Sequence, residues 1–196
     1  MNVIAAFDFD GTITTKDTLF DFIKFYVGKK KLILGLFILS PTLILYKIGI
    51  IKNDVAKQKM FSYFFKGESI TTFNMKGKEY ASRIKEIAKP SIIEKIRTHQ
   101  SQNHKVIIIS ASISNWIEPW ASNDMNIDEV MGTNIEVNNG ILTGKFKSEN
   151  CYGQEKVNRL LAVYPNRNEY TLYAYGDSPG DKQLLELADY PTLLKN

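Results

Sequence analysis

Two aspartates, Asp8 and Asp10, stand one residue apart at the end of the apolar run 3–7. An apolar run of this length that is followed by Gly11 is typical of a buried parallel strand. Such strands open onto the ligand-binding edge of an α/β sheet, so both carboxylates are expected there. Residues i and i+2 start on the same face of a strand, where two carboxylates repel unless a cation or a shared proton lies between them. The pair is therefore a candidate Mg²⁺ site.

A second apolar run, 106–109, predicts another buried strand of the same sheet. This strand delivers Ser110 and Ala111 to the edge where Asp8 is expected. A hydroxyl and exposed backbone N–H groups at that edge are suited to bind phosphate oxygens.

The C-terminal half adds two acids and a lysine. The run 171–175 predicts a third strand, and Asp177 and Asp181 follow it. Lys156 lies where a helical pattern begins. Its fixed positive charge is suited to a phosphoryl group or to a charged nucleophile.

These four groups of residues, in this order, resemble the signatures of the haloacid dehalogenase superfamily of phosphohydrolases. The matching residues are 8–12, Ser110, Lys156 and 176–181, and they span nearly the whole chain. The resemblance implies an α/β fold, a HAD-like Rossmannoid parallel sheet core with a helical C1-type cap inserted after the first strand. The long and mostly helical gap between the first two signatures indicates where that cap lies.

By this resemblance the protein is a Mg²⁺-dependent phosphomonoester hydrolase that acts through an aspartyl-phosphate intermediate. Asp8 would be the nucleophile that attacks phosphorus. Asp10 would first protonate the leaving group and later activate water.

The resemblance also implies a metal site and a phosphate site. Magnesium would be held by the Asp8 carboxylate, the Asp10 main-chain carbonyl and Asp177, with Asp181 as a further or supporting acid. The expected phosphate-binding residues are Thr12, Ser110, Ala111 and Lys156.

The spacing predicts a catalytic core of residues 1–16 and 89–196 and a helical cap of residues 17–88. In the cap, helices are expected over 17–27, where Gly28 ends the first one, 54–66 and 70–88. In the core, a helix is expected to start at Pro90 and another to cover 113–123, followed by a strand near Val130 and a hairpin turning at 138–140.

The cap contains an uncharged apolar segment, 32–46, which Pro41 divides. A spanning helix needs about 20 apolar residues, so a transmembrane helix is not expected. Lysines 29–31 precede the segment and Lys47 follows it. Two interpretations remain: a helical hairpin buried in the cap or in an interface, or peripheral membrane contact through 29–51 with the lysines on anionic headgroups.

Two groups of subfamily IB are similar to this chain. Phosphoserine phosphatases bind their substrate with an acid after the first motif, for which Asp17 is the candidate, and with a cap arginine, whereas residues 18–82 here contain none. Phosphatidylglycerophosphatase C-like proteins share an apolar cap and a Cys-x-Gly-x-x-Lys-Val motif, matched by 151–157. We therefore expect a phospholipid headgroup phosphate such as phosphatidylglycerophosphate as substrate, with phosphoserine or another phosphorylated small molecule as the alternative.

Composition limits the other function classes. The single cysteine, Cys151, excludes an internal disulfide, and the two histidines do not form a zinc cluster. The predicted apolar strand directly after Met1 leaves no room for a cleavable signal peptide. These features predict a cytoplasmic protein. If the apolar segment binds lipid, the protein would be peripheral to the inner face of the membrane. The net charge of +4 is mild, and the basic residues do not form a stripe interleaved with aromatic residues. A nucleic-acid partner is therefore not expected.

Two non-enzymatic alternatives stay open. A receiver-type phosphoacceptor also uses an aspartate beside magnesium, but it lacks the Asp-x-Asp-Gly-Thr motif and a long helical insertion. A catalytically silent membrane-binding module would not need the acids, all of which are present.

Overall fold

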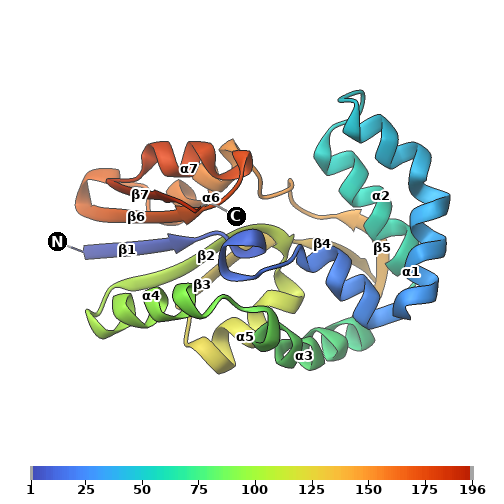
Figure 1. Ribbon diagram of the computed structural model, residues 1–196, viewed down its shortest axis with the longest axis horizontal. Coiled ribbons are helices and arrows are strands. Elements are labelled where there is room, and N and C mark those ends of the chain that lie inside the picture. Colours follow the sequence, from blue (N-terminus) through green and yellow to red (C-terminus); the bar gives the residue numbers. More distant parts are fainter. Residues whose placement is uncertain (1, 195–196) are drawn as a thin grey trace.

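The computed structural model describes residues 2–194, and its centre is a parallel β-sheet with helices on both faces (Figure 1). The described residues form five strands of this sheet in the order β3-β2-β1-β6-β7. The strands are β1 (Asn2–Phe7), β2 (Lys105–Ile113), β3 (Glu129–Thr133), β6 (Tyr170–Gly176) and β7 (Tyr190–Leu193). All four pairings are parallel, which confirms the α/β fold expected from the three apolar runs.

The sheet is buried on both faces, as expected of central parallel strands with continuous apolar sequence. In β1, Ala5 and Phe7 enter one hydrophobic cluster while Ile4 and Ala6 enter a second one. The first cluster includes residues of α4 (Pro90–Ser101) and α5 (Ser114–Met125). The second includes residues of α6 (Gln154–Val163) and α7 (Lys182–Leu187) on the opposite face.

The cap is a helical insertion between β1 and β2, as expected. Its helices are α1 (Thr18–Lys47), α2 (Asn53–Phe65) and α3 (Ile70–Ile87), after which α4 leads to β2. The hairpin of β4 (Ile135–Asn138) and β5 (Ile141–Phe146), which turns where predicted, packs against α2. The division between core and cap at residues 16/17 and 88/89 remains a prediction.

The chain enters and leaves the cap through two segments that lie side by side. The Thr15 N–H donates to the Ile87 carbonyl at 2.8 Å, and the Lys89 N–H donates to the Ile13 carbonyl at the same distance. Aromatic packing adds a second connection, because the Phe22 ring of α1 stacks on the Trp116 ring of α5 with centroids 4.6 Å apart. These contacts set the position of the cap over the sheet edge.

The first cap helix ends where predicted, because the backbone leaves the helical conformation at Gly28, with φ 82° and ψ 161°. A second helical segment of α1 follows at once and continues to Lys47. The prediction is wrong at Pro41, which lies within this second segment and does not divide the apolar segment. A proline costs a helix interior about 3 kcal/mol. Packing of Leu36, Leu39 and Leu43 against the cap core offsets this cost.

A histidine pair lies on the α4 face of the sheet, against β6. His99 Nε2 is 2.9 Å from the Tyr175 hydroxyl, and its Nδ1 is 2.8 Å from Nδ1 of His104. Burial lowers the pKa of His99 to about 4, and the neighbouring His104 acts in the same direction. His99 is therefore neutral in the folded protein at neutral pH.

The free energy of unfolding should fall as the pH is lowered from about 6.5 to about 4, because the unfolded chain binds a proton at His99 in this interval and the folded chain does not. The full contribution is up to about 3 kcal/mol. Chemical denaturation at a series of pH values, compared with His99→Gln, measures it. The variant should lose less stability over the same interval, and parallel curves for the two proteins would contradict the prediction.

Candidate active site

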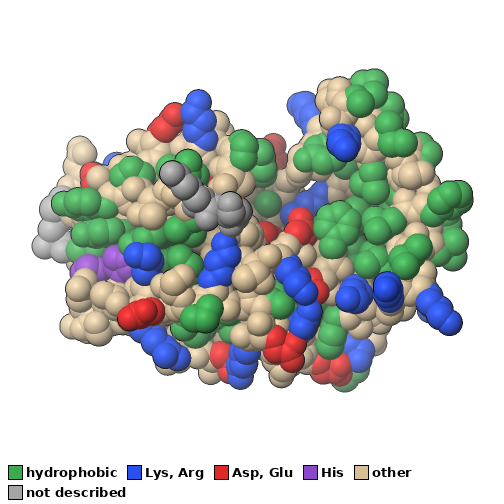
Figure 2. Space-filling view, in the orientation of Figure 1, with side chains coloured by type: hydrophobic (Ala, Val, Ile, Leu, Met, Phe, Trp, Pro, Cys, Tyr) green, Lys and Arg blue, Asp and Glu red, His purple; other side chains and the backbone are tan. Residues whose placement is uncertain are grey.

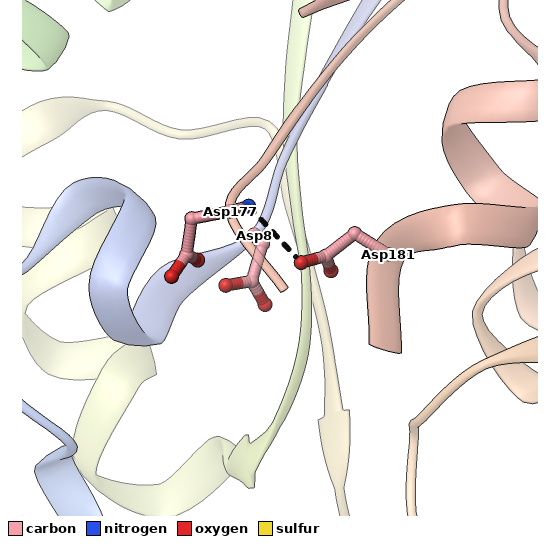
Figure 3. Close-up of side chains that lie close together, drawn as sticks. All are labelled: Asp8, Asp177 and Asp181. Atoms are coloured by element: carbon pink, nitrogen blue, oxygen red, sulfur yellow. Dashed lines mark hydrogen bonds between the residues drawn. The ribbon is translucent and has the colours of Figure 1, made fainter. Parts of the chain in front are cut away.

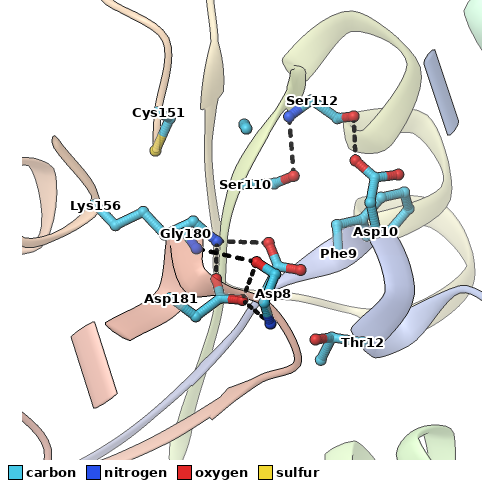
Figure 4. A network of polar contacts seen from close by, with 12 residues as sticks. Asp8, Phe9, Asp10, Thr12, Ser110, Ser112, Cys151, Lys156, Gly180 and Asp181 are labelled. Carbon is cyan, nitrogen blue, oxygen red and sulfur yellow. Dashed lines mark hydrogen bonds and ion pairs between the residues drawn. The ribbon is translucent and has the colours of Figure 1, made fainter. Parts of the chain in front are cut away.

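The carboxyl ends of β1, β2 and β6 bring the residues expected from the motifs to one edge of the sheet (Figure 4). Asp8 follows β1, Ser110 lies near the end of β2, and Asp177 follows β6. The Asp8 N–H donates to the Tyr175 carbonyl at 2.9 Å and so continues the pairing of β1 with β6. Because β1 lies between β2 and β6, groups from both neighbours flank Asp8.

A tight turn over Phe9–Ile13 carries the chain away from the sheet. Gly11 has φ +80°, and a Cβ at this position would collide with the Asp177 carboxylate. The Thr12 hydroxyl donates to Asp177 Oδ1 at 2.8 Å. The turn after β1 and the loop after β6 are therefore in direct contact, which requires a glycine between them.

Three carboxylates converge at this edge (Figure 3). Asp8, Asp177 and Asp181 each offer an oxygen atom, and these atoms lie within 4.8 Å of one another. Asp181 is oriented by Ser178, whose N–H and hydroxyl donate to Oδ2 at 3.0 and 2.8 Å. Hard divalent cations prefer a set of carboxylate oxygens, so these residues fit a metal site.

Lys156, at the start of α6, is buried between two of these acids. Its Nζ lies 2.5 Å from Asp8 Oδ1 and 2.6 Å from Asp181 Oδ1. Burial alone would lower the pKa of Lys156, but the two carboxylates outweigh it and raise the pKa above its usual value. The lysine is therefore a permanent positive charge beside Asp8.

The environment of Asp8 is unusual for a carboxylate. Burial raises its pKa to about 7, the charges of Asp181 and Asp10 act in the same direction, and Lys156 opposes them. For Asp181, burial has the same effect, but Lys156 and Ser178 outweigh it and lower the pKa. A cation between these groups would favour the ionised form of Asp8.

Asp10 is held apart from the acidic cluster (Figure 4). Its Oδ1 accepts hydrogen bonds from the Thr18 N–H at 2.7 Å and the Thr18 hydroxyl at 2.6 Å, and its Oδ2 accepts one from the Ser112 hydroxyl. Thr18 in turn accepts a hydrogen bond from Trp116 Nε1 at 3.2 Å. These donors orient the Asp10 carboxyl at the junction of core and cap.

The end of β2 places Ser110 and Ala111 as expected, although with partners that the sequence did not reveal. The Ser110 hydroxyl is buried and accepts a hydrogen bond from the Ser112 N–H at 3.0 Å. The Ala111 carbonyl accepts one from Lys57 Nζ at 2.7 Å.

Lys57, on α2 of the cap, was not predicted as a site residue. Burial lowers its pKa, while the nearby carboxylates of Asp10, Asp17 and Asp8 oppose that effect. Lys57 is thus a lysine of the cap that lies near the Asp10, Asp17 and Asp8 carboxylates. Figure 2 shows a hollow between the cap and the core, with basic and acidic side chains in it. The sequence signal that could have identified Lys57 was a lysine among the apolar positions of an expected cap helix.

Asp17, the predicted specificity residue, has a structural role. Its Oδ1 accepts hydrogen bonds from the N–H groups of Leu19 and Phe20 at 2.9 and 3.3 Å, which caps the N-terminus of α1. It still lies near Lys57 and Asp10, so it belongs to the rim of the same site.

Comparisons with known proteins show the family of this chain. The family of haloacid dehalogenase-like hydrolases matches residues 5–186. Protein CicA of Caulobacter vibrioides is 30% identical over 193 residues, which cover 95% of this chain and 83% of CicA.

Solved structures share the fold at lower sequence identity. A protein with unknown function from Bordetella pertussis has a TM-score of 0.83 at 19% identity, covering 98% of this chain and 90% of that one. A phosphoserine phosphatase, solved as an analogue of its phospho-aspartyl intermediate, has a TM-score of 0.63 at 16% identity. The match covers 95% of this chain and 83% of that one. With the family match spanning most of its length and the acidic cluster at the expected sheet edge, the chain belongs to the haloacid dehalogenase-like hydrolases.

Proposed function

We propose that this hydrolase is a Mg²⁺-dependent phosphomonoesterase that forms an aspartyl-phosphate on Asp8. The observation that carries the proposal is the placement of Asp8, which is buried beside the permanent charge of Lys156 and forms the acidic cluster with Asp177 and Asp181. A carboxylate so placed is shielded from water and faces groups that neutralise a phosphoryl oxygen.

In the first half-reaction, an Asp8 oxygen attacks phosphorus while the bond to the leaving oxygen breaks, and Asp10 gives that oxygen a proton. In the second, Asp10 takes a proton from water as the water attacks the same phosphorus and releases Asp8 and inorganic phosphate. The Thr18 and Ser112 hydrogen bonds hold the Asp10 carboxyl in a fixed orientation for both transfers.

The metal would be held by the Asp8 carboxylate, the Asp10 main-chain carbonyl and Asp177, with Asp181 in support. When bound, Mg²⁺ supplies charge neutralisation between Asp8 and the phosphoryl group. Ser110, backbone groups at Ala111 and Lys156 would bind the remaining phosphoryl oxygens. Thr12, whose hydroxyl donates to Asp177, would support the metal ligand as well as line the phosphate site.

For the substrate, we propose a phosphorylated small molecule with a second polar or anionic group. Two observations support it: phosphoserine phosphatases are among the solved structures with this fold, and Lys57 supplies a cap cation where residues 18–82 have no arginine. Lys57 Nζ would leave the Ala111 carbonyl for an anionic group of the substrate, and Asp17 lies close enough to help select it.

A second candidate substrate is a phospholipid headgroup phosphate, such as phosphatidylglycerophosphate. Several apolar side chains of α1 are exposed, which favours contact of the cap with a lipid surface. The comparisons support the small-molecule substrate better, since several of the similar solved structures are phosphoserine phosphatases by name.

Replacing the two catalytic acids should separate their roles. Asp8→Asn should abolish Mg²⁺-dependent hydrolysis of p-nitrophenyl phosphate, and Asp10→Asn should lower kcat on the order of 10² to 10⁴ by loss of proton transfer. Beryllium fluoride with Mg²⁺ should bind the unaltered protein and Asp10→Asn but not Asp8→Asn. Full activity in Asp8→Asn would contradict the mechanism.

Removing Mg²⁺ with EDTA should stop hydrolysis, and added Mg²⁺ should restore it. Calorimetric titration of Mg²⁺ should show weaker binding for Asp177→Asn than for Asp181→Asn. Because Asp181 only supports the site, Asp181→Asn should lower the Mg²⁺ affinity about 10- to 100-fold. Activity that survives EDTA, or the reverse order of the two variants, would refute the metal assignment.

Lys57→Met should raise KM for phosphoserine on the order of 10- to 100-fold, the value of a hydrogen bond to a charged group, and leave p-nitrophenyl phosphate hydrolysis nearly unchanged. Lys59→Met is the matched control, because Lys59 is exposed on the same helix. Equal losses on both substrates, or none, would show that Lys57 does not select the substrate.

A further inference from the structure

The second half of α1 presents two apolar faces, and only one of them is covered. The covered face packs on the cap core, where Gly35 lies against the rings of Tyr63 and Phe64 of α2 so closely that a Cβ would collide. Its other members are Leu32, Leu36, Leu39 and Leu43. We call the opposite, exposed face of this helix the outer face of α1. It consists of Ile33, Leu34, Phe37, Ile38, Pro41, Ile44 and Leu45 and continues in Ile48 and Ile50.

Single apolar residues scattered over a protein surface are normal, but the outer face exposes many apolar side chains next to one another. Phe37 is 77% exposed, and Ile44 and Leu34 are 58% and 57% exposed. These side chains recur every three to four residues, so they form one continuous stripe along the helix. Figure 2 shows hydrophobic side chains along this side of the cap.

The charges around the stripe have one sign. Residues 22–53 contain six lysines and no aspartate or glutamate. Lys29, Lys30 and Lys31 lie at one end of the stripe and Lys47 and Lys52 at the other, all exposed. Among residues 2–194, no helix is both long enough and apolar enough to cross a bilayer.

We propose that the outer face of α1 docks on the surface of an anionic lipid bilayer, with its apolar stripe below the headgroups and the flanking lysines among them. An aliphatic stripe bordered by lysines suits such a surface, because apolar burial and attraction to anionic lipid act together. Protein interfaces, by contrast, are enriched in aromatic residues, Met and Arg, whereas this stripe is aliphatic apart from Phe37. A second copy of this chain would also bring lysines of like charge together at both ends of the helix.

The proposal does not rest on the phosphatase activity, so its test uses binding alone. The full chain is floated with vesicles of phosphatidylcholine and with vesicles that also contain phosphatidylglycerol, at low and high salt. The chain should float with the anionic vesicles at low salt. Changing Lys29, Lys30 and Lys31 to Ser should lower this affinity on the order of a hundredfold at low salt and much less at high salt.

The stripe is tested by the double variant Phe37→Ser/Ile44→Ser, which should lose vesicle binding while keeping its circular dichroism spectrum and its hydrolysis of p-nitrophenyl phosphate. The matched control is Met75→Ser/Val163→Ser, because Met75 and Val163 are exposed apolar residues on other helices. The control for charge changes Lys78, Lys95 and Lys182, three exposed lysines elsewhere, to Ser. Both controls should float like the unaltered protein.

Three outcomes would overturn the proposal. The chain could stay with the soluble fraction under all conditions, or bind neutral and anionic vesicles equally. It could also form a dimer in analytical ultracentrifugation that Phe37→Ser/Ile44→Ser dissociates, without any flotation, in which case the outer face is an interface between copies of this chain.

Discussion

The site depends on one buried cation that holds two buried carboxylates. Lys156 lies within 2.6 Å of both Asp8 and Asp181, and neither the lysine nor the acids could be buried unpaired without a large loss of solvation energy. The pairing links three segments that are far apart in sequence, namely the end of β1, the start of α6 and the loop after β6. The proposed phosphoryl site is thus built from the same contacts that join these three segments at the sheet edge.

The sheet and most of the site could be predicted from sequence because both follow from local signals. Apolar runs that end in Asp8, Ser110 and Asp177 predict parallel strands, and parallel strands bring their carboxyl ends together. The partners of Asp10 could not be predicted in this way. Thr18 and Ser112 are 94 positions apart, and their convergence depends on how the cap packs on the core, which no local pattern encodes.

The cap shows the limit of sequence patterns most clearly. A segment that is apolar all round gives no periodicity that tells its covered face from its open one, so burial and lipid contact were both compatible with the sequence. The structure distinguishes the faces through Gly35, which lets α2 approach one of them. It also shows why Pro41 fails to end the helix, since packing along the covered face outweighs one missing hydrogen bond. Lys57 was missed for the related reason that its role depends on which face of α2 meets the core.

Thr18 is the first residue of α1, and it is also the residue that gives Asp10 two hydrogen bonds. The Asp10 carboxyl, the proposed acid and base, is therefore linked by hydrogen bonds to the first residue of the cap helices. A cap that swings outward to admit substrate would take both donors with it and leave the Ser112 hydroxyl of the core to hold the Asp10 carboxyl until the cap returns. The orientation of Asp10, and with it the proposed proton transfer, would then depend on the position of the cap.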